Sequence, residues 1–324
     1  MVINIKNYRN KYIRNQFSHV FILNNPISVF IAKLIIDSFE IPENKIYLIS
    51  FRSTNLDILP GKKIQISLSF LDKLFRKVFL FSLQGIRLRR TLERTCNEFL
   101  LYCDWDNRDI VELINSNKHK GQAYIEEGQS AFNPFKEYSF KRNRFYQFGR
   151  LKRWKKSSLL KDKLSLDIHS FNEFFNDKAF AFFTISKGSY PLIDNSKKVF
   201  FEDFSFVKNS YNPQLIGIRH IGIMCSPRRL QKDWSQSIKK LIEYLPENSV
   251  IKLHPEFYSN KVLFDKFLSV FKNLKMNKNI NLCSNEVLLE AEMLFEKKYL
   301  YGPLTSLIKY SNLLGSEFKK ICIY

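Results

Sequence analysis

The sequence predicts an α/β protein with two domains, each built on a largely parallel sheet. Two series of short apolar runs alternate with helix-like segments, one series before residue 205 and one after residue 215. A chain of 324 residues is long enough for two domains with separate cores. We place the boundary after residue 208, which gives domains over 1–208 and 209–324.

In the first series, each apolar run is followed by a turn or by helical periodicity. The run His19–Leu23 ends at Asn24-Asn25-Pro26, and apolar residues then recur at helical spacing over 28–39. Val199–Phe206 is a strand or a linker that leads to the second series. The other elements expected here are strands at 46–51, 99–103 and 122–125, and helices at 71–92 and 110–114.

The second series repeats this organisation. Its first strand, over 216–224, ends at Cys225-Ser226-Pro227, where the chain opens into a loop. The strand 249–253 leads directly to His254-Pro255. The other elements expected here are strands at 280–283, 299–301 and 321–323, and helices at 234–244, 262–273, 287–295 and 307–314.

Composition indicates a globular protein with a strongly basic surface. The chain is 45% hydrophobic and 26% charged, and its net charge is +21. Such a charge attracts polyanions, namely nucleic acid, anionic lipid, or phosphorylated and acidic sugars. Charge alone does not choose among these partners.

Cysteine usage and hydropathy favour a cytoplasmic protein. The five cysteines are far apart and form no C-x-x-C pair, which predicts free thiols in a reducing compartment and no zinc site. Every apolar run is shorter than the roughly 20 residues that a membrane span needs. The basic N-terminus is not followed by the features of a signal peptide.

Glu126 and Glu127 directly follow a predicted strand and precede Gly128. Ligands of open parallel sheets bind at the carboxyl ends of strands, where such carboxylates would lie. One of them could remove a proton from an attacking hydroxyl as a general base. Neighbouring residues point in different directions, so the other carboxylate would pack or form hydrogen bonds. The alternative for the pair is a solvated acidic turn.

His254 and the Thr305-Ser306 pair also follow predicted strands. Pro255 restricts His254 to extended geometry, so its imidazole is aimed and could donate a proton to a leaving phosphate. Thr305 and Ser306 come after Gly302-Pro303 at the expected start of a helix, where hydroxyls and backbone N–H groups can bind phosphate. The alternatives are a structural histidine and an ordinary helix cap.

Together these motifs, in this order, resemble those of bacterial sialyltransferases that build lipooligosaccharide caps (glycosyltransferase family 52) or polysialic acid capsules. The matching segments are Tyr124-Ile-Glu126-Glu127-Gly128, Lys252-Leu-His254-Pro255 and Gly302-Pro-Leu-Thr305-Ser306. The turn Leu23-Asn-Asn25-Pro26 also resembles the first strand-to-helix turn of the family. The motif order covers nearly the whole chain, although Glu replaces Asp in many relatives' acidic motif and Thr-Ser replaces Ser-Ser or Ser-Thr.

The resemblance implies two Rossmann-like domains facing across a cleft, the GT-B type, and an inverting, metal-independent sialyltransferase without a cofactor. Cytidine monophosphate (CMP)-sialic acid would be the donor and a cell-surface glycan precursor the acceptor. Glu127 or Glu126 would be the base, and His254 would assist the departing phosphate. The donor-binding residues it implies are Thr305 and Ser306 for the phosphate, Glu286 for the ribose hydroxyls, and Pro255, Gly128 and Asn25.

Three alternatives stay open. The donor could be a different nucleotide sugar, such as a CMP-Kdo-like donor. The triplet Asp104-Trp105-Asp106 has the form of a metal-binding D-x-D motif, but we interpret it as a strand end and helix cap. Net charge also permits a nucleic-acid-binding protein.

The segment 141–163 is strongly basic. Ten of its 23 residues are Lys or Arg, with aromatic residues among them, which predicts either docking to an anionic membrane leaflet or a solvated face.

Overall fold

A computed structural model describes most of the chain and divides it into two compact units. The described residues are 17–51, 54–64, 82–105, 108–132, 179–191, 193–230, 234–274, 278–303 and 305–322. The first unit draws on residues 1–23, 35–50 and 60–202, and the second on 24–34, 51–59 and 203–324. The boundary after residue 208 and the functional labels of the two domains stay predictions.

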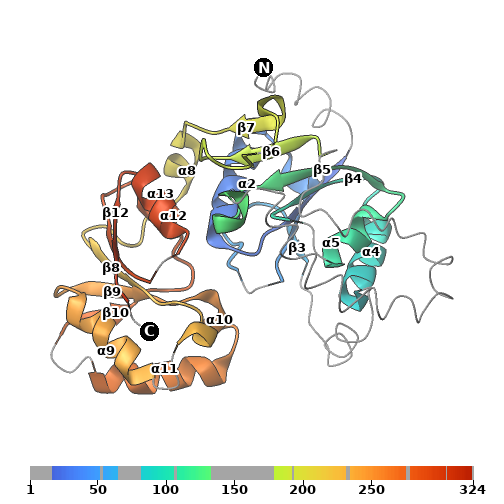
Figure 1. Ribbon diagram of the computed structural model, residues 1–324. Coiled ribbons are helices and arrows are strands. Elements are labelled where there is room, and N and C mark those ends of the chain that lie inside the picture. Colours follow the sequence, from blue (N-terminus) through green and yellow to red (C-terminus); the bar gives the residue numbers. More distant parts are fainter. Residues whose placement is uncertain are drawn as a thin grey trace. The chain divides into compact units, whose positions relative to one another are not determined.

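The first unit is built on a parallel sheet of seven described strands in the order β3-β2-β1-β4-β5-β6-β7 (Figure 1). The strands β1 and β4 are buried at every position, because a central parallel strand is covered on both faces. The strands are β1 (Ser18–Ile22), β2 (Ile46–Ile49), β3 (Lys62–Ile64), β4 (Phe99–Cys103), β5 (His119–Ile125), β6 (Ala181–Thr184) and β7 (Lys198–Phe200).

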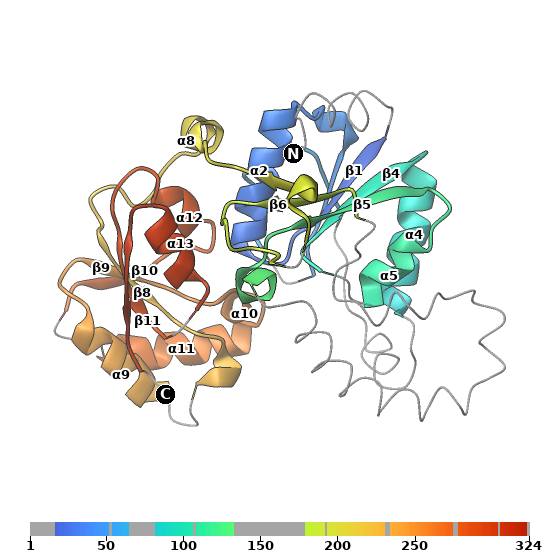
Figure 2. The ribbon, with the colours of Figure 1, turned by 45° about the horizontal axis from the view of Figure 1, so that its top comes forward.

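Three helices connect the early strands of this sheet. They are α2 (Pro26–Phe39), α4 (Leu83–Thr95) and α5 (Arg108–Ile114). The helix α2 leads from β1 towards one edge and α5 leads from β4 towards the other, so right-handed crossovers place them on opposite faces. In Figure 2, α4 and α5 lie side by side. The order of the strands therefore reverses between β1 and β4.

The second unit is built on a parallel sheet of five described strands in the order β10-β9-β8-β11-β12. In Figure 1, α9, α10 and α11 lie on one side of this sheet, and α12 and α13 lie on the other. The strands are β8 (His220–Ile223), β9 (Ser249–Lys252), β10 (Ile280–Leu282), β11 (Tyr299–Gly302) and β12 (Glu317–Lys320). The helices are α8 (Ser205–Ser210), α9 (Trp234–Tyr244), α10 (Pro255–Tyr258), α11 (Lys261–Leu274), α12 (Leu289–Glu292) and α13 (Leu307–Leu313).

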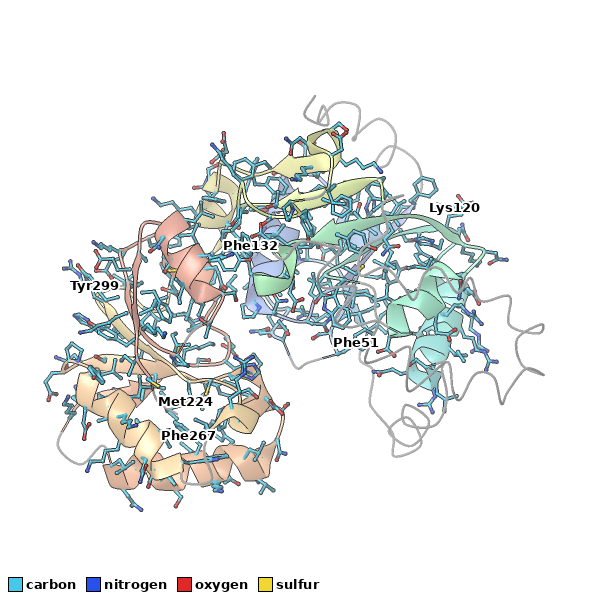
Figure 3. All side chains as sticks on the ribbon, viewed as in Figure 1. Phe51, Lys120, Phe132, Met224, Phe267 and Tyr299 are labelled. Carbon is cyan, nitrogen blue, oxygen red and sulfur yellow. The ribbon has the colours of Figure 1, made fainter. Side chains whose placement is uncertain are left out.

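An apolar core fills the space between the second sheet and the helices α9 to α11. Met224 and Phe267, both labelled in Figure 3, belong to it, together with the fully buried Phe257 of α10. The rings of Phe257 and Phe267 meet edge to face with centroids 5.3 Å apart. This packing fixes the carboxyl ends of β8 and β9, and the predicted functional residue His254 follows β9.

The structure corrects three of the expected elements. The strand expected over 216–224 is confined to β8, because Gly217 adopts a left-handed φ of +80° in the turn before it. The helix expected over 287–295 is the single turn α12, since the Leu288 N–H donates to the Tyr211 hydroxyl (3.1 Å). The last described strand is β12, not 321–323. It is a lysine-bearing edge strand with little apolar signal.

Two further expectations concern the described residues. None of the helices there is both long and apolar enough to cross a membrane. No disulfide joins the five cysteines, all of which lie in described ranges, and four of them are buried. Of the helix expected over 71–92, the structure describes the part within α4, and residues 65–81 lie outside the described ranges.

Candidate functional site

The carboxyl edge of the second sheet brings together most of the residues that the sequence singled out. Ser226 follows β8, His254 follows β9, Glu286 follows β10 and Thr305 follows β11. The strand order reverses between β8 and β11, and open α/β sheets bind ligands at the carboxyl ends beside such a reversal. The second unit therefore has a candidate ligand site at this edge.

Gly302, the last residue of β11, allows the two strands at the reversal to approach closely. A Cβ atom at this position would lie 2.6 Å from the carbonyl oxygen of Ile223, at the end of β8. Such a contact is too short for any side chain, so the position requires glycine. The Gly302-Pro303 turn can then leave the sheet at this point and lead to Thr305.

His254 is exposed and caps the one-turn helix α10. Its Nδ1 accepts a hydrogen bond from the Glu256 N–H (3.2 Å), and Pro255 occupies the first helical position. In a neutral imidazole the proton then lies on Nε2, which makes that nitrogen a hydrogen-bond donor. The imidazole thus has a defined tautomer, as an acid or donor towards a phosphate requires.

A side-chain link joins the loops after β8 and β9. The Ser226 hydroxyl donates to Oε2 of Glu256, two residues after His254, at 2.6 Å. Sequence reasoning missed Glu256, because its partner is 30 residues away and no spacing signals the contact. The link holds the two loops on the β9 side of the strand reversal.

Glu286 lies exposed in the turn after β10 and does not open a helix as expected. Its backbone N–H donates to the Ser284 hydroxyl oxygen (3.1 Å), which shapes the turn. Thr305 and Ser306 are half-buried before α13. The Thr305 hydroxyl accepts from the Leu307 N–H (3.3 Å), while Ser306 forms no side-chain cap. The sequence therefore placed the hydroxyl pair correctly at a helix start, whereas the helix after Glu286 begins at Leu289, two residues later than expected.

In the first unit, the acidic pair divides into one buried and one accessible carboxylate. Glu126 is completely buried, and its Oε2 accepts from the Thr184 hydroxyl and from the N–H groups of Ile185 (2.9 Å) and Ser186 (3.1 Å). Glu127 is only half-buried. Gly128 has a left-handed φ of +42°, which explains the glycine after the pair. Glu126 could contact a substrate only by giving up its hydrogen bonds to Thr184, Ile185 and Ser186, whereas Glu127 could do so without this loss.

Two more side chains lie near the acidic pair. Tyr190 is buried with a left-handed φ of +50°, and its pKa is raised well above the usual value by burial and by the nearby Glu126 carboxylate. Asp104 is buried at the end of β4 and accepts from the Trp105 N–H (3.1 Å). Asp106 lies outside the described residues. Among those described, no three His, Cys, Asp or Glu side chains form a group that could hold a metal ion.

Asn25, at the end of β1, caps α2. Its side-chain oxygen accepts from the Ser28 N–H (2.9 Å), and the Ser28 hydroxyl donates to the Asn25 carbonyl (2.9 Å). The Nδ2 group of Asn25 is shielded from solvent and has no hydrogen-bond partner within the described ranges. A substrate-binding role for Asn25 stays a prediction, and the basic segment 141–163 lies outside the described residues.

Glu290, on α12, gives the second unit a pH-dependent stability. Burial raises its pKa from 4.5 to about 7, against smaller opposing effects of its own backbone N–H and of Lys252. Between pH 4.5 and 7 the Glu290 carboxyl group stays protonated in the folded chain but is ionised in the unfolded chain. The stability of the fold therefore falls as the pH rises from 4.5 through 7. Above pH 8 we expect the free energy of unfolding of Glu290→Gln to exceed that of the native protein by up to about 3 kcal/mol. Below pH 4.5 we expect the two free energies to be equal.

Urea unfolding of both proteins across this pH range measures the effect, since the difference cancels the titration of all other groups. Glu286→Gln is the matched control, because it makes the same change at an exposed position nearby. A difference between Glu290→Gln and the native protein that does not change with pH would contradict the prediction.

The two parallel sheets define the class of the fold, an α/β fold of the GT-B type. MnaA of S. aureus in complex with UDP is similar over 95% of this chain and 79% of its own, with a TM-score of 0.53 and 11% identity. At this identity, the likeness concerns the fold. No family model and no curated protein matches the sequence.

Two other solved structures have lower scores. The calicheamicin glycosyltransferase CalG4 covers 94% of this chain and 80% of its own, with a TM-score of 0.45 and 7% identity. A UDP-GlcNAc 2-epimerase from Neisseria meningitidis bound to UDP-GlcNAc covers 93% and 81%, with a TM-score of 0.41 and 11% identity.

Proposed function

We propose that the protein is an inverting glycosyltransferase that binds a nucleotide-sugar donor at the carboxyl edge of its second sheet. The observation that carries this proposal is the position of His254, Glu286 and Thr305 after three strands of one sheet, around the reversal of strand order. Glu286 would accept hydrogen bonds from the ribose hydroxyls, and Thr305 and Ser306 would bind the phosphate. The GT-B fold, which nucleotide-sugar enzymes use, supports the same interpretation.

The proposed reaction is a single in-line displacement without a metal. The acceptor hydroxyl loses its proton to Glu127 and forms a bond to the anomeric carbon. The bond from that carbon to the phosphate oxygen breaks, and the nucleotide departs with the electron pair. His254 donates a hydrogen bond or proton to the phosphate from Nε2. The chain thus contributes orientation and charge placement. The reaction requires Glu127 and His254 to reach the same substrate.

We further propose that the donor is CMP-sialic acid and the acceptor a cell-surface glycan precursor. The support is the order of the three motifs, and the net charge of +21 attracts acidic sugars among other polyanions. A donor with another nucleotide is the second candidate, because MnaA binds UDP within the same fold. Calorimetric titration with CMP and UDP separates the candidates. Binding of neither nucleotide would contradict the proposed function.

His254→Ala is expected to lower the transfer rate by about 10²–10⁴-fold, the range for loss of a general acid or base. The imidazole is exposed, so the fold should survive. Transfer from radiolabelled CMP-sialic acid to a glycan acceptor measures the effect.

Two control variants separate catalysis from helix capping. His254→Asn keeps a side chain that caps α10 and should be equally inactive. His220→Ala removes a histidine at the amino end of β8, which bonds Tyr301 at 2.9 Å, and should keep full activity. Activity in His254→Asn would show that the residue serves only as a cap.

A further inference from the structure

Lys252 is the last residue of β9, and its side chain extends to the turn that follows the neighbouring strand β10. Its side chain is nine-tenths buried, and Nζ donates to the carbonyl oxygens of Ser284 (2.6 Å) and Asn285 (3.1 Å) in the turn after β10. Both acceptors precede Glu286. The lysine therefore joins the strand that carries His254 to the turn that carries Glu286.

Tyr258 of α10 holds the same turn from a second side. Its hydroxyl donates to the carbonyl oxygen of Cys283 (2.8 Å), and the Lys252 ammonium lies 5.9 Å from the centre of its ring. Three consecutive carbonyl groups, from Cys283 to Asn285, are thus bonded by side chains of the β9–α10 segment.

Burial of this ammonium is costly. Desolvation lowers the pKa of Lys252, and an immobilised lysine side chain also loses conformational entropy. A turn that served only to connect two elements could leave its carbonyl groups in water. The arrangement instead fixes the position of Glu286 with respect to His254, two residues after Lys252.

We propose that Lys252 is a positioning residue that keeps Glu286 at a fixed place beside His254 for binding of the nucleotide ribose. This inference rests on the proposed function. Lys252 acts through the turn 283–286 and does not contact the substrate itself. Because Glu286 would bind the nucleotide equally in the ground and transition states, loss of Lys252 should raise the donor KM and leave kcat nearly unchanged.

A double-mutant cycle tests the inference. Lys252→Met should weaken CMP binding about tenfold in calorimetry, and Glu286→Gln should do the same. If Lys252 acts through Glu286, the double variant should bind about as weakly as Glu286→Gln alone. Tyr258→Phe, a milder change at the same turn, should weaken binding by a few-fold, and Lys252→Arg should restore part of the affinity.

Lys298→Met is the matched control. Lys298 is fully buried and donates to the carbonyl oxygens of Leu215 (2.6 Å) and Ile218 (3.1 Å), but it lies before β11, at the opposite edge of the sheet. The Lys298→Met variant should be less stable than the native protein but should bind the nucleotide with the same affinity. Hydrogen exchange should become faster at residues 283–286 in Lys252→Met only.

The outcomes separate the inference from the proposed function. Unchanged affinity in Lys252→Met, or additive losses in the double variant, would overturn the positioning role while nucleotide binding by the native protein stands. Absence of nucleotide binding in the native protein would overturn the proposed function and the positioning role with it.

Discussion

Glu127→Gln is expected to lower the transfer rate by about 10²–10⁴-fold and to leave the fold intact. The amide has nearly the same shape as the carboxylate but cannot take the proton of the acceptor hydroxyl. Glu127 is half-buried, and it follows the completely buried Glu126 at the carboxyl end of β5. If it is the general base, kcat should fall while the affinity for the nucleotide stays the same.

Transfer kinetics and nucleotide calorimetry on the same preparation measure these two effects. Glu98→Gln is the matched control, because Glu98 is a partly exposed glutamate before β4 that pairs with Lys120 (3.0 Å) at the amino end of the sheet. A Glu127→Gln variant with native kcat would remove this residue from the mechanism.

Glu126→Ala is expected to lower the free energy of unfolding of the first unit by about 2–4 kcal/mol. Three donors meet at Oε2, one hydroxyl and two backbone N–H groups. Alanine leaves the buried Ile185 N–H without this acceptor, whereas the Thr184 hydroxyl and the Ser186 N–H keep second, neutral partners in the Ser186 carbonyl (2.9 Å) and the Thr184 hydroxyl oxygen (3.0 Å). The backbone N–H of Glu126 also donates to the Phe183 carbonyl (2.9 Å), so the residue joins β5 to β6 twice.

Urea unfolding measures this loss, and Glu98→Ala provides the control for removal of a surface glutamate. Glu126→Gln should lose less, because its amide oxygen can still accept two of the hydrogen bonds. A Glu126→Ala variant that stays as stable as the native protein but loses transfer would assign the catalytic role to Glu126 instead of Glu127.

The second unit uses a buried carboxylate in the same way. Glu292 of α12 is completely buried and accepts from the Tyr211 hydroxyl (2.9 Å) and the N–H groups of Gln214 (2.7 Å) and Leu215 (3.0 Å). In both units, one carboxylate thus satisfies several donors of a loop that lies outside the sheet. Charge-assisted hydrogen bonds are the stronger kind, which suits them to this purpose.

The sequence was informative wherever a signal is local. The periodicity of 234–244 predicted α9, the apolar run 99–103 predicted β4, and Pro255 after His254 predicted a constrained imidazole. Alternating strands and helices were enough for the α/β class and for two parallel sheets. The edge strands β3 and β12 were missed, because exposed lysines replace the apolar pattern there.

Amino-acid order alone thus established the fold class, most of the buried strands, and the edge of the second sheet where His254 and Thr305 lie. Only the tertiary structure decided which glutamate of the acidic pair is buried, that Glu286 lies in a turn, and that Lys252 holds this turn. The reason is physical. Periodicity and turn chemistry act between near neighbours, whereas the partners of Glu126 and Lys252 are 58 to 60 and 32 to 33 residues away. Such contacts exist only after the sheets have formed.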